Sequence, residues 1–139
     1  MDSTQQTIDI LELHYSMARY MNDFLSKGIV QGKDLVMLDL LRSNGIGNPA
    51  KLSQELGLTS GRITNILNSL AKDGLVSKKK NRQDARKITV TLTQKGYAEA
   101  NDLRNRMIST HDEIARKLGK HDTSELIRII CKLVDSPEH

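Results

Sequence analysis

The sequence predicts a mainly helical fold with one small β-hairpin, an α+β protein, and three observations lead to this prediction. Apolar residues recur at helical spacing through most of the 139 residues. Two short segments, 75–80 and 87–92, are strand candidates, the second with strict alternation of apolar and polar residues. Basic residues concentrate between Arg62 and Lys95, around these strand candidates. The chain has the length of one domain, so residues 1–139 are expected to form a single domain.

The composition limits the class of protein. Hydrophobic residues make up 37% of the chain and aromatic residues 3%, so the core is expected to be small and to gain from an extra face buried in a partner. No apolar run reaches the roughly 18 residues of a membrane span, and the N-terminus lacks the pattern of a secretory signal. Cys131 is the only cysteine, which excludes an intrachain disulfide. We therefore expect a cytoplasmic protein with no membrane partner.

The first 48 residues predict two helices and a turn. From about residue 4 to 26 apolar residues cover much of the helical circumference, so this helix should be buried on two sides. A second helix is expected from Lys33 to Arg42, with Leu35, Leu38 and Leu41 directed inward. The segment 43–48 is rich in turn residues.

Two short helices joined by a tight turn are expected next. Asn48 can cap the first helix, Pro49 suits its first position, and Gly57 can end it. Thr59 can cap the second helix, which has an apolar stripe over 63–70. Its opposite face carries the polar residues expected to contact DNA: Ser60, Arg62, Thr64, Asn65 and Asn68. This pattern fits a helix-turn-helix whose second helix reads base edges in the major groove. The alternative is an ordinary helical hairpin with a polar solvent face.

The strand candidates then predict a basic β-hairpin, which is called a wing when it follows a recognition helix. Its residues expected to contact DNA are Lys78, Lys79, Lys80, Arg82, Asp84, Arg86 and Lys87. Arg86 is expected to enter a minor groove, whose negative potential favours a guanidinium, with Asp84 holding it in position. The alternative for Asp84 and Arg86 is a surface ion pair of little consequence.

The charge distribution supports the DNA-binding interpretation. Between Arg62 and Lys95 nine basic residues face two acidic ones, which gives this segment a net charge of +7. The whole chain carries +4, so the remainder carries −3. Basic charge confined to one segment is the electrostatic footprint of a phosphate-binding surface. A solvated charged loop is the alternative.

The C-terminal third predicts helices with surplus apolar surface. A helix of about 25 residues, near 38 Å long, is expected from residue 93 to 118, and Gly119 can end it. Asp122 and Glu125 resemble a capping box for a last helix. We expect the helices at about 4–26 and 97–135 to form a homodimer around a DNA-binding lobe at about 33–96.

Two stretches of the sequence resemble the MarR family of regulators. Residues 58–76 resemble that family's recognition helix and its exit, and residues 84–96 are similar to its wing, with Asp, one residue, Arg, then a strand ending in Leu-Thr and a glycine. Gly61 departs from the pattern, since a side chain is more usual there. The resemblance implies a winged helix-turn-helix flanked by N- and C-terminal dimerisation helices, a palindromic double-stranded DNA operator, and repression relieved by a small-molecule effector or an oxidant. It places a ligand near His14, Met17, Met21 and Met37, which are equally good core residues.

Other functions find less support in the sequence. Residues 28–34 only partly match a phosphate-binding loop, and there is no nucleophile elbow or zinc-protease motif. We therefore expect no enzyme activity, no catalytic residues and no cofactor. His111, His121 and Cys131 leave open a metal- or redox-responsive sensor of the same fold, although they form no compact ligand motif, and no metal site is assigned. A winged-helix module used only for protein contacts is a further alternative, which the +7 segment disfavours.

Overall fold

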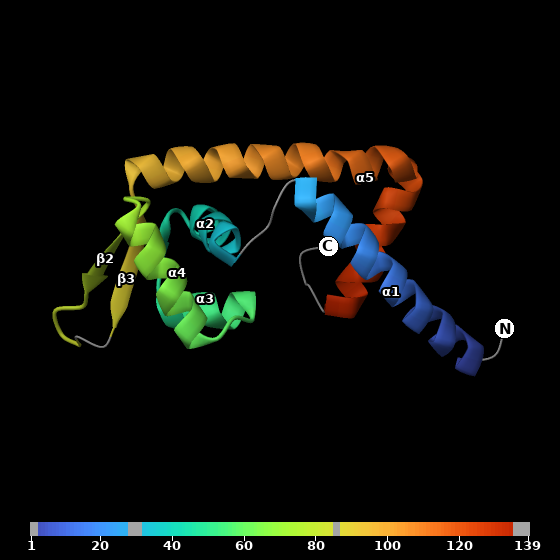
Figure 1. Cartoon of the computed structure of the whole chain (residues 1–139), viewed down its shortest axis with the longest axis horizontal. Coiled ribbons are helices and arrows are strands. Elements are labelled where there is room, and N and C mark those ends of the chain that lie inside the picture. Colours follow the sequence, from blue (N-terminus) through green and yellow to red (C-terminus); the bar gives the residue numbers. More distant parts are fainter. Residues whose placement is uncertain (1–2, 28–31, 85–86, 135–139) are drawn as a thin grey trace. The chain divides into compact units, whose positions relative to one another are not determined.

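The structure is a computed structural model that describes residues 3–27, 32–84 and 87–134 (Figure 1). The chain divides into two compact units, residues 1–103 and 104–139. It is mainly helical with one small sheet, as the sequence predicts. The elements in chain order are α1 (Ser3–Lys27), α2 (Gly32–Arg42), β1 (Ile46–Gly47), α3 (Pro49–Leu56), α4 (Ser60–Lys72), β2 (Val76–Lys80), β3 (Ile88–Leu92) and α5 (Gln94–Val134).

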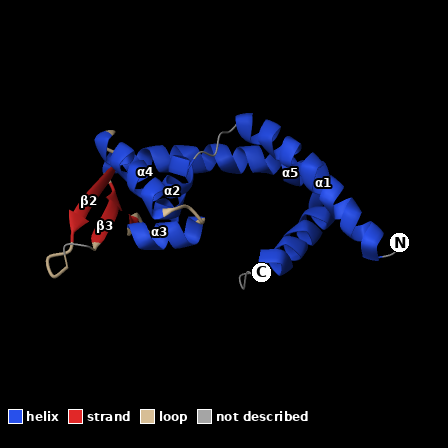
Figure 2. Cartoon of the chain, turned by 60° about the horizontal axis from the view of Figure 1, so that its bottom comes forward, coloured by secondary structure: helices blue, strands red, loops and turns tan. Residues whose placement is uncertain are grey.

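The core of the first unit lies between α2, α3, α4 and the sheet (Figures 1 and 2). The largest side chains buried there are Val36, Leu40, Leu52, Ile63, Leu67, Leu70 and Val90. The sequence-based orientation of α2 is wrong, because Leu35, Leu38 and Leu41 are only half-buried. The stripe next to them, with Met37 between Val36 and Leu40, faces the core instead. Both stripes of α2 are apolar, so periodicity alone does not distinguish them.

The ends of α3 and the start of α4 follow the predicted capping residues. The Asn48 Oδ1 atom accepts a hydrogen bond from the backbone N–H of Lys51 at 2.8 Å, with Pro49 at the start of α3. Gly57 ends α3 in the left-handed conformation, at a φ of 65°. Thr59 then accepts from the backbone N–H of Arg62 at 3.1 Å. The helix-turn-helix geometry is thus fixed by local hydrogen bonds.

The sheet has three antiparallel strands in the order β1-β3-β2. The hairpin of β2 and β3 was predicted, but β1 was not. The two residues of β1 pair with Val90 and Thr91 of β3, and the Gly45 carbonyl accepts from the backbone N–H of Leu92 at 2.8 Å. The Tyr97 hydroxyl donates to the Asn44 carbonyl at 2.8 Å and holds the preceding turn in place. A strand of two residues shows no periodicity in a sequence.

Helix α5 is interrupted at Gly119, where the sequence predicts an end. Gly119 has φ 83° and ψ 167°, a conformation accessible essentially only to glycine. The predicted capping box does not form beyond it. Instead, the Arg128 Nη2 atom lies 3.0 Å from the Glu125 Oε2 atom. The hydrogen bond from Arg128 and its positive charge lower the pKa of the Glu125 carboxyl. The helix resumes after Gly119, so Asp122 lies inside the helix.

Apolar side chains on α1 and on the last part of α5 are exposed in the single chain. On α1 they are Ile8, Ile10, Leu11, Leu13, Tyr15, Met17 and Tyr20. On α5 after Gly119 they are Leu126, Ile127, Ile129, Ile130, Leu133 and Val134. The two-sided burial expected for the first helix is therefore not provided by the described part of one chain. Over these same described residues, no helix combines the length and hydropathy needed to cross a membrane.

Candidate nucleic-acid interface

Helix α4 presents a polar face opposite its buried stripe. Ile63, Leu67 and Leu70 are at most 1% exposed and fix the rotation of the helix on the core. The face turned away from them is exposed and carries all five predicted residues of the recognition helix: Ser60, Arg62, Thr64, Asn65 and Asn68. The apolar anchor thus determines which side chains a DNA groove would meet.

The polar residues of α4 differ in what they contact. The Thr64 hydroxyl donates to the Ser60 carbonyl at 2.9 Å, which turns its oxygen toward the helix backbone. The Arg62 guanidinium lies close to the start of α2. A Cβ atom added to Gly32 would lie 3.0 Å from the Arg62 Nη2 atom. Asn65 is exposed beside an open groove of about 560 Å³ between α2 and α4. The groove is lined by Gly32, Lys33, Leu35, Leu58, Arg62, Asn65, Ile66 and Ser69.

The register of the hairpin assigns the lysines of β2 to opposite faces of the sheet. Val76 pairs with Leu92, and both side chains are buried. Lys78 pairs with the buried Val90, so Lys78 lies on the core-facing side of the sheet. Lys79 pairs with the exposed residue Thr89 and lies on the other side. The core-facing side of β2 therefore changes from apolar to basic as the strand leaves the core.

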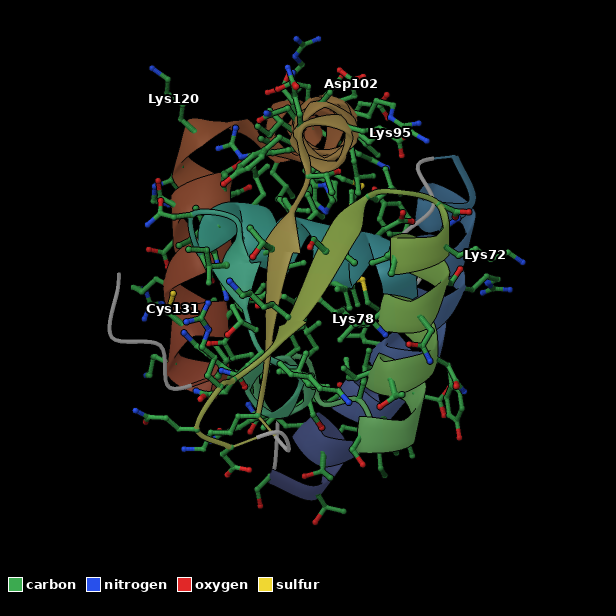
Figure 3. All side chains as sticks on the ribbon, turned by 90° about the vertical axis from the view of Figure 1, so that its left-hand side faces the viewer. Lys72, Lys78, Lys95, Asp102, Lys120 and Cys131 are labelled. Carbon is green, nitrogen blue, oxygen red and sulfur yellow. The ribbon has the colours of Figure 1, made fainter. Side chains whose placement is uncertain are left out.

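A hydrogen bond joins the wing to the recognition helix. The Lys78 Nζ atom donates to the Asn68 Oδ1 atom. Figure 3 shows the labelled Lys78 between β2 and α4. The sequence places both residues in the predicted interface. It does not reveal their contact with each other, because a contact between a helix and a later strand is not visible in a local pattern.

The loop at the end of the hairpin is organised by Asn81. The Asn81 Oδ1 atom accepts from the backbone N–H groups of Gln83 at 2.8 Å and Asp84 at 3.3 Å. The Asn81 N–H donates to the Lys87 carbonyl at 2.8 Å, and the Lys87 N–H donates to the Asp84 carbonyl at 3.0 Å. Arg82 and Lys87 are exposed and Asp84 is half-buried. The predicted residue Arg86 lies outside the described residues.

Lys95 forms a hydrogen bond within the protein, at the C-terminal end of α4. Its Nζ atom donates to the Asp73 carbonyl at the end of α4, at 3.0 Å, where the helix dipole favours a cation. The Thr93 hydroxyl donates to the Gly74 carbonyl at 2.6 Å and accepts from the Gly96 N–H at 3.0 Å. Figure 3 shows Lys72, Lys78 and Lys95 from the hairpin side. Part of the charge of the basic segment therefore supports the fold.

The residues predicted to line an effector pocket lie in different environments. His14 and Met17 are exposed on α1, and Met37 is 4% exposed in the core of the lobe. The Met21 side chain lies outside the described residues. Cys131 is half-buried on α5. In the parts of the chain that the structure describes, no three His, Cys, Asp or Glu side chains gather as a metal site would require.

The comparisons with known proteins all find regulators of transcription. Residues 28–103 match the family model described as transcriptional regulator SarA/Rot. The chain is 31% identical over 88 residues to the HTH-type transcriptional repressor YetL of Bacillus subtilis; the match covers 63% of the chain, which spans about half (51%) of the length of that relative. A mutant of MarR from E. coli complexed with operator DNA has the same fold, with a TM-score of 0.71, 22% identity and 96% and 99% of the two chains covered. PcaV from Streptomyces coelicolor, in complex with its natural ligand, gives a TM-score of 0.70 at 19% identity, with 92% of each chain covered.

Proposed function

The chain belongs to the SarA/Rot family of transcriptional regulators and has the winged-helix fold of the MarR type, and on this premise we propose that it binds double-stranded DNA in a sequence-specific manner. In this proposal the protein is a homodimer that represses transcription from a palindromic operator and is released by an effector. Helix α4 enters the major groove and the β2–β3 wing contacts the flanking backbone and minor groove.

One observation carries this proposal: the exposed polar face of α4 lies beside a basic hairpin, with Asn68 bonded to Lys78. A basic hairpin that was only a solvated charged surface would not require a polar helix face beside it. A polar helix face and a basic ribbon side by side match the two kinds of contact that DNA requires, base edges and phosphates. The +7 charge of the segment that contains both elements supplies the long-range attraction to DNA.

The proposed homodimer is supported by exposed apolar surface. Leu133 on α5 is 84% exposed and Ile10 on α1 is 68% exposed in the single chain. Large apolar side chains left in water favour association, and closed two-fold dimers are the commonest solution. The proposed repression and release are supported by the relatives, because YetL is described as a repressor and PcaV was solved with a ligand. The pocket at His14, Met17, Met21 and Met37 stays a prediction.

Selection of bound sequences from random DNA tests the proposed function. We expect a palindrome whose half-sites lie about 10 bp apart, centre to centre, because each α4 of a dimer needs a major groove on the same side of the duplex. Sedimentation at micromolar concentration should show a dimer. Failure to enrich any sequence would favour the other candidate, a winged helix used for protein contacts alone. A monomer with undiminished affinity for DNA would contradict the proposed symmetry.

A second prediction concerns Asp84 and Arg86 in the wing. If Asp84 orients Arg86 in a minor groove, both Arg86→Ala and Asp84→Ala should weaken operator binding, and the double variant should be little worse than Arg86→Ala. The direction of the change in DNA affinity for Asp84→Ala is decisive. If Asp84 had no orienting role, removing its negative charge near the phosphates should tighten binding. Titrations at one fixed salt concentration measure these effects.

Arg82→Ala is the matched control for Arg86→Ala. It removes the same charge from the same loop, so it measures the loss that general attraction to phosphates produces. Arg86→Ala should exceed that loss while leaving the melting temperature nearly unchanged. Tighter binding by Asp84→Ala would mean that Asp84 has no orienting role.

A further inference from the structure

The wing leaves the hydrophobic core partway along β2. The pair of Val76 and Leu92 is buried, and Val90 is the last buried residue of β3 on the way to the loop. Beyond that level the core-facing positions of the hairpin are Lys80 and the half-buried Ile88. Apolar packing therefore fixes the base of the hairpin more firmly than its outer part.

The hydrogen bond between Lys78 and Asn68 lies at this transition. Lys78 stands opposite Val90, and its ammonium reaches across to the side chain of Asn68 on α4. The acceptor lies on the exposed polar face of α4, about 1.7 turns beyond Arg62. A charged donor and an amide oxygen thus join the recognition helix to the wing where apolar contact ends.

We propose that Asn68 is a positioning residue, which acts through Lys78 to hold the wing at a fixed angle to α4, and that it is not a reader of DNA bases. This inference rests on the proposed function. The two elements must meet one duplex, in which the spacing of groove and backbone is set by the DNA. A hairpin already held at the correct angle loses less freedom on binding, so the hydrogen bond increases affinity without itself touching DNA.

The proposal predicts a specific pattern of coupling. Asn68→Ala should weaken operator binding by up to about fivefold, which corresponds to the upper end of the roughly 0–1 kcal/mol that an exposed charged pair contributes. Lys78→Met removes the ammonium and keeps the aliphatic stem, so it should weaken binding at least as much. Adding Asn68→Ala to Lys78→Met should cause no further loss, because both changes break the same bond. Asn68→Asp retains an acceptor oxygen for Lys78 and should preserve the position of the wing.

Hydroxyl-radical footprinting at saturating protein separates a positioning role from base reading. With Asn68→Ala we expect the central protection by α4 to remain and the flanking protection by the wing to fade. Lys79→Met is the matched control, since it removes a lysine one residue along the strand on the opposite face of the sheet. It should weaken binding through lost charge and leave the footprint unchanged, and Asn68→Asp should restore the flanking protection.

The outcomes distinguish this inference from the proposed function. If the unaltered protein protects no DNA, the proposed function fails and the inference fails with it. If the unaltered protein protects both regions and Asn68→Ala does so too, the inference alone is overturned. It is also overturned if the losses from Asn68→Ala and Lys78→Met multiply, or if the loss from Asn68→Ala disappears on operators altered at a single base pair, because both results identify a base contact.

Discussion

Replacing Gly96 by alanine should destabilise the protein by about 3 kcal/mol and lower its melting temperature by roughly 10 °C. A Cβ atom at this position would lie 2.0 Å from the Leu75 carbonyl oxygen. That oxygen already accepts a hydrogen bond from the Thr93 N–H at 3.0 Å, so it cannot retreat without weakening the bond that joins the residue before α5 to the residue before β2. Backbone moves less readily than a side chain, and the clash must displace the first turn of α5.

Gly61→Ala is the matched control for this prediction. Gly61 also lies in the first turn of a helix, but a Cβ there would meet nothing within 4 Å. Alanine is favoured over glycine in a helix by about 0.5–1 kcal/mol, so this variant should be slightly more stable than the unaltered protein. Thermal denaturation followed by circular dichroism measures both changes. Equal melting temperatures for the two variants would mean that the helix start yields easily at Gly96.

Asn65→Ala should weaken binding to the selected operator by about 1–3 kcal/mol, or roughly fivefold to 150-fold, with little change on random DNA. Asn65 is exposed on α4 and lines the open groove between α4 and α2. An asparagine side chain can pair with both hydrogen-bonding atoms of an adenine edge, and its loss removes that discrimination.

Lys72→Ala serves as the comparison for Asn65→Ala. Lys72 is exposed in the last turn of α4, where a phosphate contact would be independent of sequence. Its loss should weaken binding equally on operator and random DNA and reduce the dependence on salt by about one ion. Anisotropy titrations at several salt concentrations give both quantities. If Asn65→Ala also lost affinity equally on both DNAs, Asn65 would be a phosphate contact rather than a base reader.

The parts of the fold that depend on local chemistry could be predicted from the sequence. Asn48, Gly57 and Thr59 act within one turn of the helix ends that they define, so their roles are visible in a short window. The inward face of α2 and the strand β1 depend on elements distant in the sequence. Periodicity shows that α2 is apolar, but only packing against α3, α4 and the sheet shows that Leu40 is buried more deeply than Leu41.

The candidate site divides in the same way. The sequence was sufficient to assign polar residues to one face of α4, because the buried stripe fixes the rotation of a helix. It was not sufficient to separate side chains available to DNA from those engaged within the protein. Lys78 reaches Asn68 ten positions earlier, and Lys95 reaches the carbonyl of Asp73. A count of basic residues treats all of these charges alike, whereas in the structure the ammonium groups of Lys78 and Lys95 already form hydrogen bonds within the protein.

The strand order has a consequence for solubility. Within the described part of the chain β2 pairs with β3 alone, so its other edge leaves backbone N–H and C=O groups available to a strand from another molecule. Such an edge is a starting point for aggregation, and charged side chains, lysine above all, are a common protection against it. Lys78, Lys79 and Lys80 occupy three consecutive positions of this edge strand. The lysines that we propose attract DNA thereby also repel a second copy of the same hairpin, so a change that neutralised all three would favour self-association through β2.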